Sequence, residues 1–233
     1  MSLYPLGISR SRDLPRVAEQ STRGGGEWHP HIPPTSGQVA VRWVLADELA
    51  GALIDAPQVT PKPLEHAAAL DAIHRQMCVL PMRFGTVPCD EAGIRSLLKA
   101  RRGDLIERLD RLEGTCEMGL RIALPKFRIP QAKPSPDTSP SISYLQQRRA
   151  HYQRQESFGE RARLTVQRLV EELQGTYRDW RWLTPSPPGL ARLAFLVDRE
   201  VVGLFQKHLE ASAAQRPEEQ RTLLGPWPPY SFV

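Results

Sequence analysis

Alternation of apolar and polar residues over three short segments is the feature of this 233-residue chain that most limits its fold. Side chains that are apolar at every second position predict strands with one buried face. The three segments are Glu117–Leu124, Tyr177–Leu183 and Leu190–Asp198. Helical patterns fill Ser141–Leu173 and Arg199–Ala213, and a last strand is predicted near Leu223. The order β-α-β-β-α-β is that of a ferredoxin-like sandwich, in which two helices cover one face of an antiparallel sheet.

The first half of the chain predicts a strand-poor α+β unit. Apolar patterns favour strands over Gln38–Leu45 and Ala50–Ala56 and a helix over Leu64–Met77. A second helical pattern, Asp90–Leu112, has a possible break at Gly103. We therefore expect an α+β protein with two domains, residues 1–112 and residues 113–233.

No motif in the sequence supplies the chemistry of an enzyme or of a cofactor site. The six histidines are scattered, and the three cysteines are too few and too irregularly spaced for a disulfide framework, which suits a reducing cytoplasm. Gly-rich phosphate loops, nucleophile elbows and zinc-ligand spacings are missing from the sequence. We expect no catalytic residue, no bound cofactor and no metal.

Charge and hydropathy also narrow the range of partners. The net charge of +5 is spread along the chain without a basic stripe, so nucleic acid is not an expected partner. No apolar run reaches the length of a membrane helix, so a membrane is not expected either.

An apolar segment, Cys78–Val87, contains one arginine, Arg83. A buried guanidinium needs a carboxylate or backbone carbonyls as partners, because an unpaired buried charge is very unfavourable. The sequence therefore predicts that Arg83 is mostly buried and paired, while Pro81 and Gly85 predict a special backbone path. Two roles remain open for this segment: it pins a domain core, or it forms a docking or assembly surface.

The last ten residues, 224–233, are apolar and aromatic and contain three prolines. Proline fixes φ and removes a donor, so this C-terminal segment is predicted to run extended. We expect Trp227, Tyr230 and Phe232 to pack, either onto the second domain or between the domains. Two roles remain open here as well, a structural seal and an element that docks a partner.

Both unusual segments resemble motifs of the gas vesicle protein family F/L (GvpF/GvpL). Shorter blocks at Leu112–Gly119 and Ala194–Arg199 resemble the same family, and all four blocks follow the family order. The family opens with a clean strand, which Pro5 interrupts in this chain. The motif residues to which we assign a structural or interaction role are Leu80, Pro81, Arg83, Phe84, Gly85, Gly225, Pro226, Trp227, Pro228, Pro229, Tyr230 and Phe232.

This resemblance implies an accessory or minor structural protein of gas vesicle assembly that is not an enzyme. It implies two α+β domains, the second ferredoxin-like with an extended tail. The expected location is the cytoplasm and the gas vesicle. The expected partners are the hydrophobic shell protein, during nucleation or growth, and other gas vesicle accessory proteins. The alternative is an RNA-binding or regulatory module on a ferredoxin-like fold, for which Trp180 and Trp182 on one strand face are the only hint.

Overall fold

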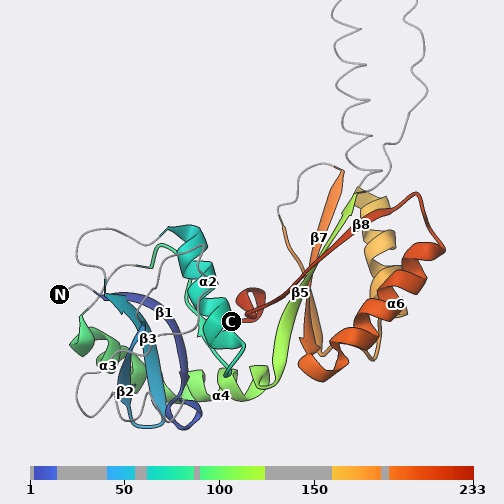
Figure 1. Ribbon diagram of the computed structural model, residues 1–233. Coiled ribbons are helices and arrows are strands. Elements are labelled where there is room, and N and C mark those ends of the chain that lie inside the picture. The colour runs from blue at the N-terminus through green and yellow to red at the C-terminus, as the bar shows by residue number, and fades with distance from the viewer. Residues whose placement is uncertain (1–2, 15–40, 56–61, 87–89, 124–158, 185–188) are drawn as a thin grey trace, which may run out of the picture. The chain divides into compact units, whose positions relative to one another are not determined.

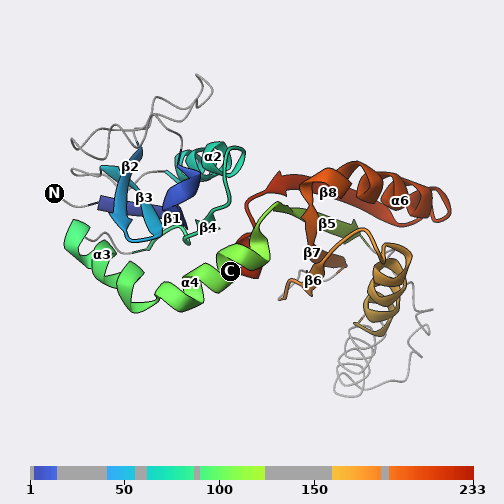
Figure 2. The same cartoon turned by 90° about the horizontal axis from the view of Figure 1, so that it is seen from below.

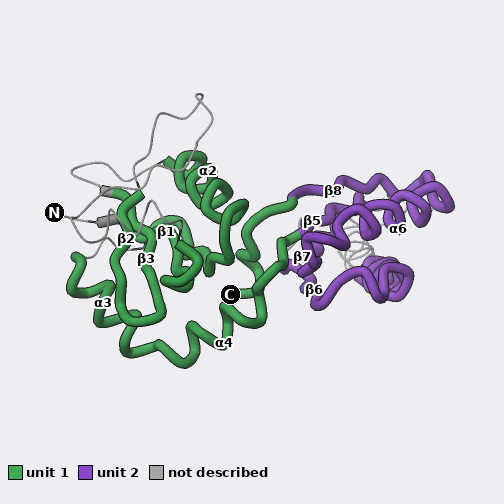
Figure 3. Tube along the Cα trace, turned by 60° about the horizontal axis from the view of Figure 1, so that its bottom comes forward, with its two compact units in different colours: residues 1–117, 226–233 green, residues 118–225 purple. Residues whose placement is uncertain are grey.

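The computed structural model describes residues 3–14, 41–55, 62–86, 90–123, 159–184 and 189–233 (Figure 1). The chain is a mixed α+β protein with two four-stranded sheets. Its internal contacts divide it into two compact units (Figure 3). Unit 1 consists of Met1–Glu117 together with Pro226–Val233, and unit 2 consists of Met118–Gly225. Unit 2 is therefore inserted into unit 1, whose last eight residues follow it in the chain.

The sheet of unit 1 has the strand order β2-β3-β1-β4. Its strands are β1 (Leu3–Arg10), β2 (Val41–Ala46), β3 (Leu49–Asp55) and the short β4 (Leu80–Pro81). The expectation of a strand-poor first half is wrong, because β1 forms in spite of Pro5. The pairing of β1 with β3 shifts register between Pro5 and Gly7, and such a bulge accommodates a residue without an N–H donor.

Gly7 in β1 shows why this part of the sheet tolerates no side chain. A Cβ atom at this position would lie 2.6 Å from Cγ2 of Val79 and 2.9 Å from the carbonyl oxygen of Leu80. The close approach brings β4 directly against β1, where Gly7 pairs with Pro81 and Ile8 with Leu80 (Figure 2).

Three helices complete the described part of unit 1: α2 (Pro63–His74), α3 (Glu91–Ala100) and α4 (Arg102–Leu112). Proline at the first position and the carboxylate of Glu65, which accepts from the Lys62 N–H at 3.0 Å, start α2. Asp90 caps α3 by accepting from the Gly93 N–H at 2.7 Å. The predicted helix over residues 90–112 is thus two helices, and the break lies at Arg101, two residues before Gly103.

The second sheet, most of which lies in unit 2, has the order β6-β7-β5-β8. Its strands are β5 (Thr115–Ala123), β6 (Asp179–Trp182), β7 (Leu190–Asp198) and β8 (Gln220–Trp227). Along the chain, a helix over residues 159–172 lies between β5 and β6, and α6 (Val202–Ala214) lies between β7 and β8. The predicted hairpin is confirmed, since β6 pairs with β7 antiparallel. Residues 141–158 of the predicted long helix lie outside the described residues.

Candidate interaction surface

Residues 226–233 of the C-terminal segment belong to unit 1, and their contacts with it are made near the end of the chain, at Ser231 and Phe232. The Phe232 side chain is fully buried, and the guanidinium of Arg111 in α4 donates to its carbonyl oxygen. Ser231 donates twice to the carboxylate of Glu117, from its backbone N–H at 2.7 Å and from its hydroxyl at 2.8 Å. Hydrogen bonds to charged groups are stronger than neutral ones, so these contacts fix the segment firmly.

The backbone of this segment is not extended throughout, as the sequence had predicted. Pro229 has φ −77° and ψ 61°, and the Tyr230 N–H donates to the Pro228 carbonyl at 2.8 Å, the geometry of an inverse γ-turn. Residues Tyr230–Phe232 then form one turn of 3-10 helix. This curl turns Phe232 into the core of unit 1 and leaves Tyr230 outside.

Two of the three aromatic side chains of the segment are exposed, which corrects the expectation that all three pack. Trp227 is 42% exposed and Tyr230 is 39% exposed. The phenol of Tyr230 is nevertheless partly desolvated; this burial and the nearby carboxylates of Asp71 and Glu117 raise the pKa of Tyr230 to about 12. Tyr230 therefore stays neutral at physiological pH while part of its side chain remains exposed to the solvent.

The apolar segment that follows α2 forms β4 and then a tight turn. Leu80 and Pro81 are buried, and the Met82 N–H donates to the Leu6 carbonyl of β1 at 2.8 Å. His66 of α2 donates from Nε2 to the Met82 carbonyl at 3.1 Å. Burial lowers the pKa of His66 in spite of this bond, so the ring is neutral at physiological pH.

Arg83 is exposed, and the prediction that it is buried and paired is wrong. In the part of the chain that the structure describes, its guanidinium makes no hydrogen bond or ion pair. The apolar flanks of Arg83 misled the sequence argument because burial ends with Val79, Leu80 and Pro81, whereas Arg83 already belongs to the turn that follows.

The turn itself is held by three hydrogen bonds. The N–H of Thr86 donates to the Arg83 carbonyl at 3.1 Å and the Thr86 hydroxyl donates to the same oxygen at 2.5 Å. Gly85 has φ +86°, as the third residue of a type II turn requires, and its N–H donates to the Tyr4 hydroxyl at 2.6 Å. The special backbone path predicted at Gly85 is confirmed.

Phe84, at the tip of this turn, is 45% exposed and rests on two buried rings. Its centroid lies 5.7 Å from that of His66 and 6.2 Å from that of Tyr4, and the rings of His66 and Tyr4 meet edge to face at 5.6 Å. Such contacts hold Phe84 in one position while part of its ring faces the solvent.

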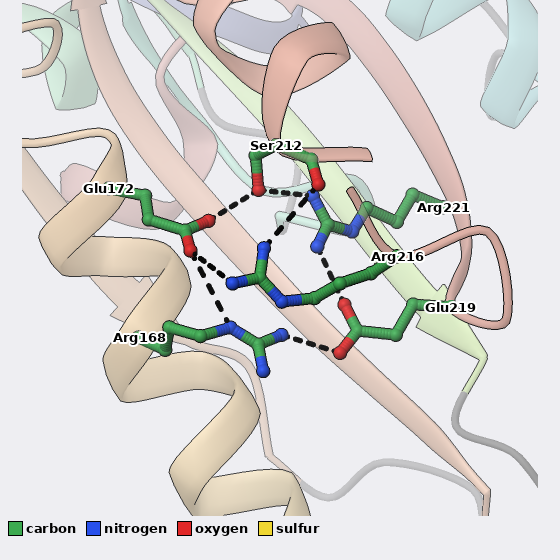
Figure 4. A network of polar contacts seen from close by, with 6 residues as sticks. All are labelled: Arg168, Glu172, Ser212, Arg216, Glu219 and Arg221. Atoms are coloured by element: carbon green, nitrogen blue, oxygen red, sulfur yellow. Dashed lines mark hydrogen bonds and ion pairs between the residues drawn. The ribbon is translucent and has the colours of Figure 1, made fainter. Parts of the chain in front are cut away.

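Unit 2 contains a polar network that the sequence argument missed (Figure 4). It joins the helix over residues 159–172 to α6, to β8 and to the connection between α6 and β8. Its members are Arg168, Glu172, Ser212, Arg216, Glu219 and Arg221. No sequence signal marks it, because its charges come from segments about 40 residues apart and have no regular spacing.

Glu219 and Arg221 are the buried charged members of this network, with side chains 7% and 4% exposed. Arg221 donates to the Glu219 carboxylate at 2.6 Å and to the Ser212 hydroxyl at 2.7 Å. Burial alone would raise the pKa of Glu219, but the hydrogen bonds from Arg221 and Arg168 outweigh it and lower that pKa. With each carboxylate paired to arginine, the network can join the helices to β8.

The two tryptophans of β6 do not form an open stacking platform. Trp180 lies opposite Phe195 of β7, and Trp182 lies opposite Leu193. Phe195 packs on Phe205 of α6 at a centroid distance of 5.3 Å, so this is the face that α6 covers. The only hint of RNA binding in the sequence is therefore a half-buried pair beside the core.

The described residues contain neither a candidate metal cluster nor a candidate membrane helix. No group of three or more His, Cys, Asp or Glu side chains in those ranges is close enough to hold a metal ion. None of the helices described here combines the length and the apolar character needed to cross a membrane.

Comparison with known proteins identifies the family. The family model described as "Gas vesicle synthesis protein GvpL/GvpF" matches residues 12–233. Gas vesicle protein L of Streptomyces sp. (strain CB03234) is 31% identical over 185 residues, which cover 72% of this chain and 67% of the relative. Gas vesicle protein F of the same strain is 26% identical over an alignment of 255 residues that covers all of both chains.

Two solved structures share the fold. The crystal structure of GvpF from Anabaena sp. PCC7120 has a TM-score of 0.72 at 17% identity, covering 99% of this chain and 95% of that one. The crystal structure of GvpF from Microcystis aeruginosa has a TM-score of 0.71 at 15% identity, with coverage of 99% and 98%. Because the family model matches nearly the whole chain, this protein belongs to the GvpL/GvpF family of gas vesicle synthesis proteins.

Proposed function

We propose that this protein is an accessory or minor structural protein of gas vesicle assembly that binds the hydrophobic shell protein during nucleation or growth. The observation that carries the proposal is the exposed pair Trp227 and Tyr230 on a segment anchored by buried Phe232. Aromatic residues on a segment that is already ordered lose little entropy on binding, and they are the residue types that most often dominate interfaces.

The physical task fits such a surface. A shell subunit that will form an air-facing wall exposes apolar surface before it is assembled, and this surface promotes aggregation. A partner that offers exposed aromatic rings beside a charged surface would keep that subunit soluble until it is incorporated. The proposed location is accordingly the cytoplasm and the growing vesicle, with other accessory proteins as further partners.

The proposal assigns the two parts of the chain different architectures. Residues 1–112 are taken as an N-terminal α+β domain and residues 113–233 as a ferredoxin-like domain with an extended tail. The sheet order β6-β7-β5-β8, with one helix before β6 and one after β7, supports the second assignment. Circular dichroism of residues 118–225 expressed alone would test whether this part folds by itself, since residues 226–233 belong with unit 1.

Binding of the shell protein to full-length variants tests the function. Trp227→Ser combined with Tyr230→Ser should weaken binding about tenfold or more, because exposed aromatic anchors are lost while the fold is not. Leu204→Ser is the matched control, since Leu204 is 48% exposed on α6 of unit 2. Wild-type affinity in the double variant, with melting unchanged, would contradict the proposal.

A further inference from the structure

The Arg83–Phe84 turn is a preorganised feature of the surface of unit 1. The backbone on both sides of these residues is fixed by hydrogen bonds from Met82 to Leu6 and from Gly85 to Tyr4. Phe84 is supported by two rings, yet 45% of it is exposed. Since the turn is already rigid, little entropy is lost when a partner contacts these two side chains.

The surface around the turn is cationic as well as apolar. Arg83 is exposed, and no side chain of the described residues pairs with it. The exposed Lys62 begins the helical turn that ends at His66, since its carbonyl accepts from the His66 N–H, and the His66 ring touches Phe84. Glu65, the acidic residue of that helical turn, already accepts from the Lys62 N–H at 3.0 Å. Among the described residues no carboxylate pairs with Arg83, so its guanidinium is open to the carboxylate of a partner.

We infer that the Arg83–Phe84 turn binds a segment of the shell protein in which a carboxylate lies next to an apolar side chain. The inference rests on the proposed function. A guanidinium matches a carboxylate by two parallel hydrogen bonds, which a lysine cannot reproduce. Phe84 beside it supplies apolar contact and excludes water from the pair, an arrangement typical of interface hot spots. This contact is separate in the chain from the exposed pair Trp227 and Tyr230, so the shell protein would be held at two points.

Charge reversal in the full-length protein tests the inference, with the shell protein fused to a soluble carrier as the probe. Arg83→Glu should weaken binding at least about tenfold, and Arg83→Lys should weaken it less. Arg163→Glu is the matched control, because Arg163 is exposed in unit 2 and makes no ion pair with the described residues. It should bind like the wild type. Wild-type binding should also weaken as salt is raised, and binding by Arg83→Glu should depend on salt less.

Compensation by the partner makes the test specific. Replacement of the shell protein's acidic residues by arginine, one at a time, should restore binding to Arg83→Glu at one position. Phe84→Ala should also weaken binding; because Phe84 contacts Tyr4 and His66, its melting is measured in parallel. If that variant is unstable, the Arg83 variants decide the question, since Arg83 supports no described contact through its side chain.

The possible failures can be told apart. Wild-type affinity in Arg83→Glu, while the Trp227 and Tyr230 double variant has lost binding, would overturn the inference and leave the proposed function standing. If Arg83→Glu binds the shell protein like the wild type but associates less with itself, the turn binds a second copy of this chain. That result would also overturn the inference. If the wild-type protein does not bind the shell protein at all, the proposed function and the inference both fail.

Discussion

Replacement of Phe232 by alanine tests whether the C-terminal segment completes the core of unit 1. The side chain is fully buried, and Phe-to-Ala changes at such sites lower the free energy of unfolding by about 3–5 kcal/mol. The loss cannot exceed the free energy with which residues 226–233 dock, because beyond that value the segment detaches. Detachment would leave the carboxylate of Glu117, which is 5% exposed, without the two Ser231 donors, a loss of about 1–3 kcal/mol.

For a unit of this size the expected fall in melting temperature is about 10 °C or more. Phe232→Leu keeps most of the volume and should cost less than about 1.5 kcal/mol, while Trp227→Ala, at a position that is 42% exposed, should change melting little. Hydrogen exchange locates the effect, since α2 reports on unit 1 and α6 reports on unit 2.

The exchange pattern decides whether the reasoning holds. Protection should fall in α2 and remain in α6, because Phe232 packs within unit 1. Melting within about 1 °C of the wild type would refute the argument, as would a loss of protection confined to α6.

Three further predictions concern pH and packing. Hydrogen bonds from Arg221 and Arg168 lower the pKa of Glu219 against the effect of burial. The Glu219 carboxylate therefore stabilises unit 2 above its unfolded pKa, and this contribution is lost as pH falls through the folded pKa. In Glu219→Gln, the stability of unit 2 in acid, followed by hydrogen exchange in α6, should depend less on pH than in the wild type. Burial lowers the pKa of His66 below the ordinary value of 6.5, so the unfolded state binds more protons than the folded state. Unit 1 should therefore lose stability as pH falls from 6.5 towards the folded pKa. Between about pH 5 and 7, the melting temperature of His66→Gln should vary less with pH than that of the wild type. Gly7→Ala would place Cβ 2.6 Å from Val79 and should lower the free energy of unfolding by about 1–3 kcal/mol in chemical denaturation; an unchanged midpoint would contradict the close packing of β4 on β1.

Periodicity predicted strands of unit 2 even where burial does not alternate, since β5 is buried on both faces over residues 115–120. The alternation in Glu117–Leu124 and Leu190–Asp198 predicted β5 and β7, and the predicted antiparallel pairing of β6 with β7 is present. The same reasoning failed at Pro5, because a bulge removed the penalty that proline carries in a strand, and no local signal announces a bulge.

The candidate site was predictable in its residues and not in its geometry. Apolar neighbours suggested a buried Arg83, but exposure depends on where β4 ends, and β4 is fixed by long-range contact with Gly7. The burial of Phe232 could be expected from its chemistry, whereas its contact with Arg111 joins residues 121 positions apart and leaves no trace in the sequence.

The insertion of unit 2 into unit 1 has a consequence for synthesis of the chain. A ribosome makes residues 1–117, then all of unit 2, and only afterwards the segment that carries Phe232. Domains generally fold as they emerge, so unit 2 can close while the nascent unit 1 still has an unfilled place in its core. During that interval the apolar surface that Phe232 covers in the folded protein is open to chaperones. Trp227 and Tyr230 therefore reach the fixed positions of the folded protein only in the last step, when residues 226–233 dock.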